Sequence, residues 1–292
     1  MEYYVAQIIN GICQGSVYAL MAIGYSVIVG MTNLVTFAFG EIIMIGAFSG
    51  YYVATYFTTN LFAILVASFL GAFVIGYFVY ITCYHHFLNA PRYIAQVCTI
   101  GASMVLKNVA QIVFGPNQKP MLGIVANAFY EIGPLRISRL QIAIILVVVI
   151  TSTALAMLYN KTRLGIAFRA VSQEKTAAYM VGINVKKTIM LGNCVGCGLG
   201  GIAGVLIAIY YQNVIANMGE LYSIKAFSSS VLGGLTDIRW SAIGGLLIGL
   251  VENLGISLTS ASLRNIFAFV FMMIVLLIKP TGLGNKKGGI RR

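Results

Sequence analysis

Long apolar runs alternate with short polar connections along almost the whole chain. A membrane-spanning helix needs about 20 consecutive, mostly apolar residues to cross a hydrocarbon core of about 30 Å. Runs of this kind predict spanning helices at residues 8–30, 61–82, 94–114, 139–159, 188–212, 241–259 and 264–279. The pattern therefore predicts an all-α, polytopic membrane helix bundle.

Two further apolar stretches are interrupted. Residues 31–57 begin with Met31-Thr32-Asn33-Leu34 and contain Gly40-Glu41, which predicts a broken entry into the second span. Residues 224–236 would form only about 20 Å of helix at about 1.5 Å per residue, so we expect a half-helix or a re-entrant piece. With these pieces the count is about eight or nine crossings, in a single domain that covers residues 1–292.

Composition supports a membrane protein and argues against a soluble one. Hydrophobic residues make up 59% of the chain and charged residues only 9%, whereas soluble domains carry roughly a quarter charged residues. The net charge of +12 could indicate a nucleic-acid partner. The basic residues lie in short connections between apolar runs, however, where the positive-inside rule places them. The expected surroundings are therefore the lipid bilayer of the cytoplasmic membrane, with no nucleic acid.

The basic residues also predict the orientation. Loop 160–187 has a single acid, Glu174, and is cytoplasmic by the positive-inside rule. The His85–Arg92 loop lies two spans away and is cytoplasmic too, which leaves loop 115–138 and the N-terminus outside. A different span count would move the N-terminus inside. The C-terminal tail is expected in the cytoplasm because it holds the basic residues Lys279, Lys286, Lys287, Arg291 and Arg292.

Small residues predict close helix contacts. Glycines recur at small-x-x-small spacings, which let membrane helices approach one another. Cys194 and Cys197 form a C-x-x-C on such a helix without a second ligand pair, so we interpret them as a helix contact and predict no metal site. The glycines at the small-x-x-small spacings are Gly196, Gly200, Gly204, Gly244, Gly245 and Gly249.

Residues 44–50 resemble residues 224–230, a weak sign of an internal repeat whose broken helices would meet near the midplane.

Four charged residues interrupt apolar segments: Glu41, Lys107, Lys225 and Glu252. A charge in hydrocarbon is costly, so such groups face the bundle interior, a cavity or the interface. Glu252 is the strongest candidate for an interior position, in a hydrogen-bonding role or in contact with substrate. Glu41 and Lys225 flank the interrupted stretches and either line a path or mark helix ends near the headgroups. Lys107 is long enough to reach the headgroups.

The 160–187 loop contains a candidate partner-binding helix. We expect Ser172 to cap a short helix whose first turn holds Glu174 and which ends at Gly182. Ala177 and Ala178 keep one face of this helix small, and basic residues such as Arg169 flank it. A helix of this kind suits docking into a groove on a partner. An ordinary cytoplasmic loop with a surface helix is the alternative.

No motif for catalysis or nucleotide binding is present. The pattern G-x-x-x-x-G-K-(S/T) is absent, and so are H-E-x-x-H and G-x-S-x-G. The histidines, His85 and His86, are adjacent and have no acid near them in the sequence. We therefore expect a protein that is not an enzyme and binds no cofactor. If ATP drives it, another chain binds the ATP.

Short motifs in order along the chain resemble the LivH-type permeases of branched-chain amino acid ABC importers. The early motifs are Asn10-Gly11, Gly15-Ser16, the run from Tyr18 to Tyr25, Phe37-Ala38, Gly40-Glu41 and Met44-Ile45-Gly46. The later ones are Gly165, Arg169-Ala170, Ala177, Gly182-Ile183, Lys225-Ala226-Phe227, Val231-Leu232-Gly233-Gly234, Ile243-Gly244-Gly245-Leu246, Gly249, Glu252 and Pro280-Thr281-Gly282-Leu283.

Two departures concern the substrate. The family's N-F-A-H-G-E stretch has Asn and His where this chain has Thr36 and Phe39. After Leu232-Gly233-Gly234, a Leu-Thr-Asp-Ile-Arg-Trp sequence replaces the family's Gly-Ser turn. The fold expectation is unaffected, but the first change lies in the stretch expected to line the path, so the cargo remains open.

The resemblance implies a subunit of a larger importer. A second, related permease of the LivM type would pair with this chain, two cytoplasmic ATPase subunits would bind ATP and Mg²⁺, and an extracytoplasmic binding protein would deliver a branched-chain amino acid. The expected coupling residues are Arg169, Glu174, Ala177, Ala178 and Gly182. The expected path residues are Thr36, Phe39, Gly40, Glu41, Lys225, Phe227 and Glu252.

Three alternatives differ from this hypothesis. Related importers carry urea or short amides, which the sequence does not exclude. A self-sufficient ion-coupled carrier would need paired intramembrane acids, for which only Glu41 and Glu252 are available. A structural or assembly protein without transport activity would also have a long apolar core with short loops.

Overall fold

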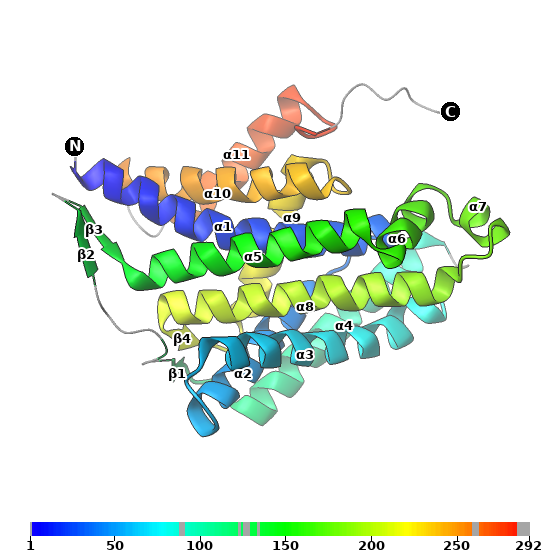
Figure 1. The fold of residues 1–292 in the computed structure, drawn as a ribbon, viewed down its shortest axis with the longest axis horizontal. Helices are drawn as coiled ribbons and strands as arrows, with labels where there is room; N and C mark the ends of the chain where they lie inside the picture. The colour runs from blue at the N-terminus through cyan, green and yellow to red at the C-terminus, as the bar shows by residue number, and fades with distance from the viewer. Residues whose placement is uncertain are drawn as a thin grey trace.

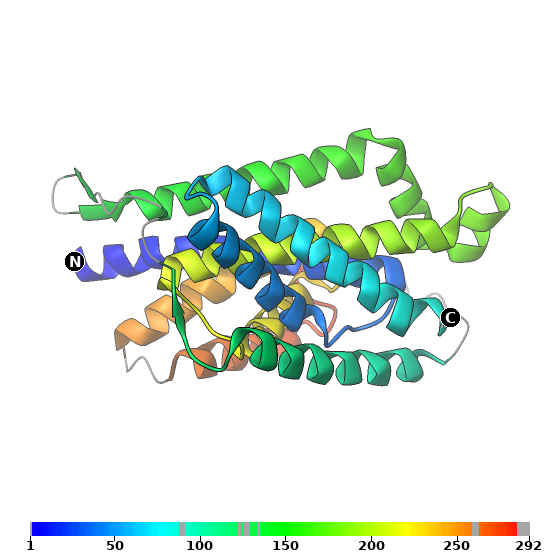
Figure 2. The ribbon, with the colours of Figure 1, turned by 90° about the horizontal axis from the view of Figure 1, so that it is seen from below.

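The computed structural model describes residues 2–87, 91–121, 124, 129–132, 135–258 and 263–284. Within these residues, six helices are long and apolar enough to cross a membrane. They run side by side along the molecule (Figure 1, Figure 2), which confirms the predicted polytopic helix bundle. These helices are α1 (Glu2–Thr32), α3 (Leu61–Val79, continued by the π-helix η1, Tyr80–His85), α4 (Arg92–Phe114), α5 (Arg139–Lys161), α8 (Val185–Tyr211) and α10 (Ile238–Leu258).

Helices α1 and α8 form the centre of the bundle. Their apolar windows are 94% and 83% buried within the chain, against 11% for α4 and 22% for α5. The outer helices therefore offer their apolar side chains to lipid or to another protein. Three shorter helices complete the bundle: α2 (Phe39–Tyr56), α9 (Met218–Gly233) and α11 (Arg264–Ile278).

The connections separate into two ends. At one end, the antiparallel strands β2 (Phe129–Ile132) and β3 (Leu135–Ser138) lie beside the start of α1 (Figure 1). At the other end lie the short helices α6 (Arg163–Gln173) and α7 (Lys175–Met180). The segments predicted outside and in the cytoplasm thus occupy opposite ends, although the sequence did not predict the strands.

A second pair of strands lies near the same end as β2 and β3. Strand β1 (Lys119–Pro120) pairs antiparallel with β4 (Asn213–Val214), which follows α8. The basic tail residues Lys286, Lys287, Arg291 and Arg292 lie outside the described residues.

Helices α1 and α8 end in the same way. Asn33, directly after α1, and Gln212, directly after α8, have left-handed backbones with φ of 57° and 56°. Left-handed backbone terminates a helix and turns the chain. A non-helical segment then leads to α2 or α9, which confirms the predicted break within residues 31–57. The second piece begins at Met218, earlier than the predicted residue 224, and forms a helix of 16 residues.

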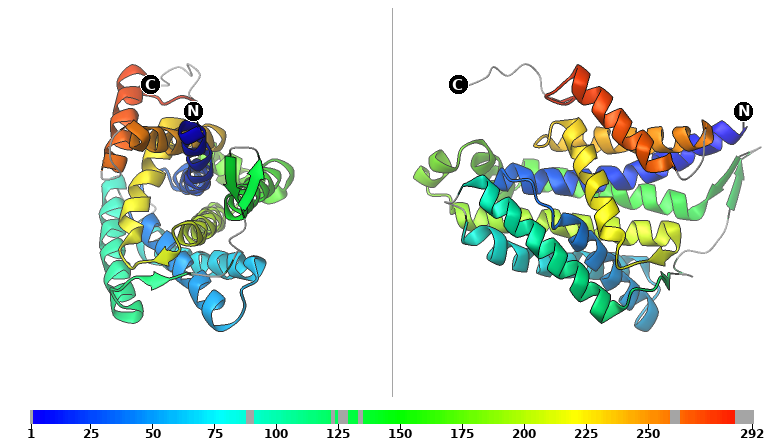
Figure 3. Two further views of the ribbon diagram at one scale, coloured as in Figure 1. Left: turned by 90° about the vertical axis from the view of Figure 1, so that its left-hand side faces the viewer. Right: turned by 180° about the vertical axis from the view of Figure 1, so that it is seen from behind.

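The first turns of α2 and α9 cross at two glycines. A Cβ atom placed on Gly219 would lie only 2.6 Å from the Gly40 carbonyl oxygen, so the crossing requires glycine. From this point α2 runs toward the β1 end, where Tyr52 lies beside Lys119. Helix α9 runs the opposite way (Figure 3, right). In the loop after α9, the Leu235 carbonyl accepts a hydrogen bond from the Ser26 hydroxyl of α1.

The crossing shows an internal repeat whose register differs by one residue from the one that the sequence indicated, because residue 44 now pairs with residue 223 and not with residue 224. Residues 39–49, Phe-Gly-Glu-Ile-Ile-Met-Ile-Gly-Ala-Phe-Ser, align without a gap with residues 218–228, Met-Gly-Glu-Leu-Tyr-Ser-Ile-Lys-Ala-Phe-Ser. Asn33 and Gln212 are equivalent in the same alignment, so both halves break at the same place. Because α2 and α9 run in opposite directions from one contact, the halves form an inverted repeat of the kind found in transporters.

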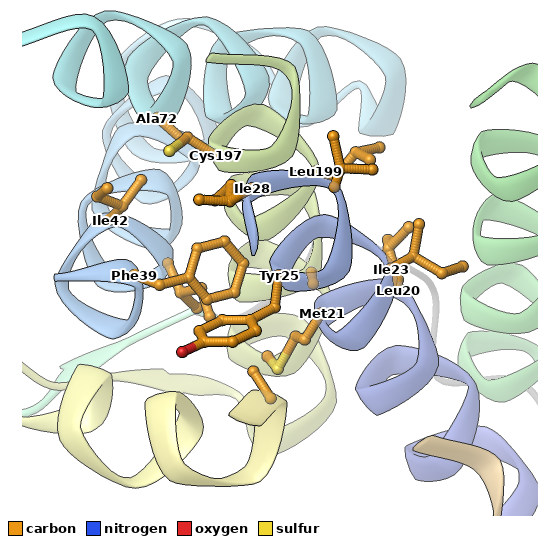
Figure 4. Close-up of a cluster of buried hydrophobic side chains, with 14 of the residues drawn as sticks. Leu20, Met21, Ile23, Tyr25, Ile28, Phe39, Ile42, Ala72, Cys197 and Leu199 are labelled. Carbon is orange, nitrogen blue, oxygen red and sulfur yellow. The ribbon is translucent and has the colours of Figure 1, made fainter. Parts of the chain in front are cut away.

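Glycines of α8 bring α1 and α2 into close contact, as predicted. A Cβ on Gly196 would lie 2.7 Å from the Gly24 carbonyl oxygen, and one on Gly200 would lie 2.8 Å from the Phe39 ring. The Phe39 ring meets Tyr25 edge-on with centroids 5.4 Å apart (Figure 4). Helix α10 packs in the same way on α1, where Gly245 faces the backbone of Ala19.

The cysteines serve the same packing. A Cβ on Gly76 of α3 would lie 2.6 Å from the Cys197 side chain, which confirms the interpretation of the C-x-x-C as a helix contact. All five cysteines are free. Within the described residues, no three His, Cys, Asp or Glu side chains gather as they would at a metal site.

The crossing makes a stability prediction. We expect Gly219→Ala to lower stability by about 1–3 kcal/mol, because the added methyl group pushes the two backbones apart. The measurement is the thermal midpoint of the protein in detergent. Gly101→Ala is the matched control, since a Cβ there meets nothing within 4 Å. Equal midpoints for the two variants would contradict the close contact.

Candidate translocation site and coupling segment

A cavity of about 320 Å³ lies beside the crossing of α2 and α9. Its wall comes from α2, α4, α9 and the segment before α2. Helices α4, α9 and α11 lie along one side of the molecule (Figure 3, left), and the lining side chains Met104 of α4 and Ile224 of α9 are 62% and 44% exposed. The lining residues are Phe37, Glu41, Ile100, Ser103, Met104, Lys107, Glu220, Ser223 and Ile224.

Charged groups of both signs line this cavity. The Glu41 side chain is 2% exposed, and its Oε2 atom makes no hydrogen bond. Ser103, Lys107 and Glu220 are the polar groups that act on this carboxylate. Lys107 Nζ lies 2.8 Å from Glu220 Oε2. The lining thus holds two acidic side chains and one basic one.

Three of the seven predicted path residues contact Tyr25 rather than the cavity. Thr36, Phe39 and Phe227 do not line the cavity. The Phe39 and Phe227 rings meet Tyr25 edge-on at 5.4 and 6.0 Å, and the Tyr25 hydroxyl donates to the Thr36 carbonyl at 3.2 Å. These residues position the start of α2. Of the predicted set, Glu41 alone faces the cavity.

Sequence reasoning missed several lining residues. Lys107 was expected to reach the headgroups, but it pairs with Glu220, which was not singled out. A signal for Glu220 was present, because Gly219-Glu220 repeats Gly40-Glu41 in the alignment of the two halves. Ser103 and Ser223 carry no such signal, since a lone serine in an apolar helix has many roles.

Lys225 and Glu252 belong to a separate, buried ionic cluster. Lys225 Nζ lies 2.7 Å from Glu252 Oε1, and the side chains are 2% and 0% exposed. Tyr18 donates its hydroxyl to Glu252 at 3.0 Å and accepts from Lys225 at 2.9 Å. Arg264 Nε donates to the same carboxylate at 3.3 Å. Lys225 therefore does not mark a helix end, and the predicted interior position of Glu252 is confirmed.

Amides extend the cluster and connect four helices. Asn253 of α10 donates to Gln14 of α1 at 2.8 Å, and Gln14 donates to Tyr211 of α8 at 2.9 Å. Arg264 of α11 also hydrogen-bonds to Gln14. Buried charges are tolerated when they are paired and hydrogen-bonded. This arrangement fixes helix positions, and neither Lys225 nor Glu252 lines the cavity beside Gly40.

The segment formed by α6 and α7 differs from its prediction. The helix that holds Ala177 and Ala178 is α7, and Glu174 rather than Ser172 stands at its N-cap, without a side-chain hydrogen bond. Thr162 caps the preceding helix α6, and its hydroxyl accepts from the Gly165 amide at 3.1 Å. Ser172 lies in the last turn of α6 and donates to the Arg169 carbonyl at 2.9 Å. The predicted single helix capped by Ser172 is therefore wrong, and Glu174 separates two helices. A serine can bond to the preceding turn instead of capping the next one.

The exposed surface of this segment is large and apolar rather than small. Ala178 is 3% exposed and packs inside the chain. Ala177 is exposed, but Tyr179, Met180 and Val181 stand 74%, 80% and 74% exposed beside it. Exposed apolar patches of this kind mark sites of protein contact.

Two further contacts position the segment. Gly182 has a positive φ of 83° and ends it, as predicted. Arg169 bonds to Asn160 at 3.4 Å, at the end of α5. Lys175 Nζ donates to the Thr32 carbonyl at 3.1 Å, at the last residue of α1. Helix α7 is thus tied to the break that precedes α2 and Glu41.

Broken helices that meet inside a bundle, a charged cavity beside them and an exposed apolar segment at one end are features typical of a membrane transport protein of the permease class. Residues 7–276 match the family model described as "Branched-chain amino acid transport system / permease component". The chain belongs to this family, which confirms the resemblance found in the sequence.

Named relatives cover almost the whole chain. The permease protein LivH of the high-affinity branched-chain amino acid transport system of Escherichia coli K12 is 31% identical over 294 residues, covering 96% of this chain and 95% of the relative. BraD of Pseudomonas aeruginosa, of the same description, is 30% identical with equal coverage. A probable LivH of Methanocaldococcus jannaschii is 26% identical, covering 94% of this chain and 90% of the relative.

The ionic cluster predicts an order of stabilities. We expect Glu252→Gln to destabilise the protein by about 3–5 kcal/mol, because Lys225 and Arg264 lose their shared acid. Lys225→Met should lower the stability by less, since Glu252 keeps its ion pair with Arg264. Thermal midpoints in detergent measure both, with the exposed Glu174→Gln as control. The reverse order would show that Arg264 does not compensate Glu252.

Proposed function

We propose that this chain is a transmembrane permease subunit of an ATP-binding cassette importer that moves branched-chain amino acids across the cytoplasmic membrane. The observation that carries the proposal is the family match over residues 7–276 together with a charged cavity at the crossing of two half-helices. Substrate sites of transporters with inverted repeats lie near the midplane, where broken helices meet.

The cavity suits an amino acid better than an uncharged amide. Phe37, Ile100, Met104 and Ile224 give it an apolar side, whereas urea and short amides are polar throughout. Uncharged substrates would also leave the Glu41 carboxylate without compensation. The relatives whose names specify branched-chain amino acids cover the whole fold of this chain.

A second permease would close the cavity. In the single chain, the lining residues Met104 and Ile224 are exposed on α4 and α9, which lie on the same side of the molecule as α11 (Figure 3, left). Met273 and Leu277 of α11 are 60% and 79% exposed. A related subunit packed on this face would shield these side chains and turn the open cavity into a passage between two subunits.

ATPase subunits would bind at α7. This chain has no nucleotide-binding loop, so ATP and Mg²⁺ belong to partner chains. Movement of α7 would reach the cavity through Lys175, which holds the end of α1 next to the break before α2. An extracytoplasmic binding protein would deliver the substrate at the opposite end, where β2 and β3 lie.

The orientation follows from the same two ends. Leu283 donates its amide to the Leu232 carbonyl at the end of α9, which supports a C-terminal segment at the α6–α7 end. We assign that end to the cytoplasm because of its basic residues. The proposed arrangement is thus a multi-pass membrane protein whose C-terminus lies in the cytoplasm.

Uptake of radiolabelled leucine into vesicles tests the function. We expect uptake only when this chain is present with its second permease, ATPases and binding protein, and only with ATP. This chain alone should be inert, because it has no energy source of its own. Leucine uptake by the chain alone, sensitive to an ionophore and independent of ATP, would favour the ion-coupled carrier.

The docking segment makes its own prediction. Met180→Asp should abolish co-purification of the ATPase while the protein still inserts, because this side chain is 80% exposed and its loss opens no cavity. Thr58→Asp is the matched control, since it adds the same charge at the exposed connection after α2, at the opposite end. ATPase retained by Met180→Asp, or lost from Thr58→Asp, would refute docking at α7.

A further inference from the structure

We propose that the cavity beside Gly40 binds the transported amino acid as a zwitterion, with Glu41 holding the α-ammonium group and Lys107 the α-carboxylate. This assignment rests on the proposed function and adds the groups that recognise the substrate. It concerns residues of α2, α4 and α9, and it separates them from the buried cluster around Glu252.

Glu41 is the group that requires a ligand. Its carboxylate is 2% exposed, and the Oε2 atom has no hydrogen-bond partner among the described residues. Its place in the first turn of α2 offsets part of the charge through the helix dipole, but it supplies no donor to Oε2. Leaving a buried carboxylate unpaired is costly, and an ammonium group would provide both the charge and the N–H donors.

Lys107 supplies the opposite charge without giving up its present partner. Its Nζ bonds to Glu220 Oε2 at 2.8 Å, and its side chain is 32% exposed. An ammonium group has three donors, so it can keep Glu220 and also hold the carboxylate of a ligand. Glu220 is 66% exposed and can be solvated when the ligand competes for Lys107.

The remaining lining fits an aliphatic amino acid. Phe37, Ile100 and Met104 are among the exposed apolar side chains of the chain, and they line the cavity together with Ile224. They would cover a branched aliphatic side chain while the charged groups hold the backbone end. The cavity of about 320 Å³ lies at the small end of ligand sites, which are about 300–1,000 Å³.

This chemistry predicts discrimination. A carboxylic acid without the amino group leaves Glu41 unpaired, and an amine without the carboxylate leaves Lys107 with Glu220 alone. Sites built to pair with a polar group strongly reject analogues that lack it, because their own buried groups then stay unpaired. The cavity should therefore accept leucine and reject both 4-methylpentanoate and 3-methylbutylamine.

The test measures leucine uptake by the complete complex in vesicles. Glu41→Gln should lower the uptake rate by about tenfold or more, the range expected when a charged hydrogen bond is lost. The control is Asn108→Ala, at the position directly after Lys107 on α4. Among the described residues, the Asn108 side chain bonds only within its own helix, to the Met104 carbonyl. Its uptake should match the wild type. Wild-type uptake by Glu41→Gln would overturn the proposal.

Exchanging the charges of Lys107 and Glu220 tests whether Lys107 binds the substrate or only joins two helices. Lys107→Glu combined with Glu220→Lys keeps an ion pair between α4 and α9 but reverses its polarity beside Glu41. We expect the complex to assemble, as measured by co-purification of its subunits, while leucine uptake stays lowered by about tenfold or more. Recovery of wild-type uptake by the double variant would show that Lys107 only joins two helices, and would overturn its assignment.

The result for the wild type keeps the two proposals apart. If the wild-type complex takes up leucine, and Glu41→Gln and the Lys107→Glu, Glu220→Lys double variant take it up equally well, the assignment of the binding site is wrong and the proposed function stands. If the wild-type complex takes up no branched-chain amino acid, the proposed function fails, and the site assignment fails with it.

Discussion

The contact between Gly40 and Gly219 is the constraint on which the rest of the structure depends. Two helices can begin against each other inside a bundle only if no side chain separates their backbones, and here a single methyl group would collide. The contact holds the first turns of α2 and α9 together and brings Glu41 and Glu220 to one cavity. The glycines of α8 support it, because they seat Phe39 and the start of α2 against the centre of the bundle.

Charge in an apolar setting distinguishes the two polar regions of the molecule. In the cluster around Glu252, helices α1, α9 and α11 each contribute a partner, and the carboxylate accepts a hydrogen bond from Tyr18 and forms ion pairs with Lys225 and Arg264. Such a site is complete and holds helices in place. In the cavity, Glu41 is equally buried, but among the described residues it forms no ion pair and its Oε2 atom has no hydrogen-bond partner, whereas each Glu252 oxygen lies within 3.3 Å of a cation. The incomplete site is the one that an external group can finish, so we assign transport to it.

Much of this architecture could be predicted from the sequence, but its contacts could not. The apolar runs predict the spans, and Asn33 within a broken run predicts the interruption before α2. The start of α9 was missed because Gly219, Glu220 and Ser223 interrupt the apolar pattern there. Ser172 has the chemistry of a helix cap, but α6 continues through it and its hydroxyl bonds to the preceding turn instead. Lys107 and Glu220 are 113 residues apart, so only the fold brings them together.

The most direct test of the crossing and its cavity is the water accessibility of a cysteine at position 223. Ser223→Cys should react with a membrane-impermeant thiol reagent in the assembled complex, and its rate should change when the ATPases are trapped with ATP. Val113→Cys, at a position of α4 whose side chain is exposed on the outside of the helix bundle, should stay unreactive. If Ser223→Cys is as unreactive as Val113→Cys in every state, no aqueous path reaches the crossing of α2 and α9, and the account is wrong.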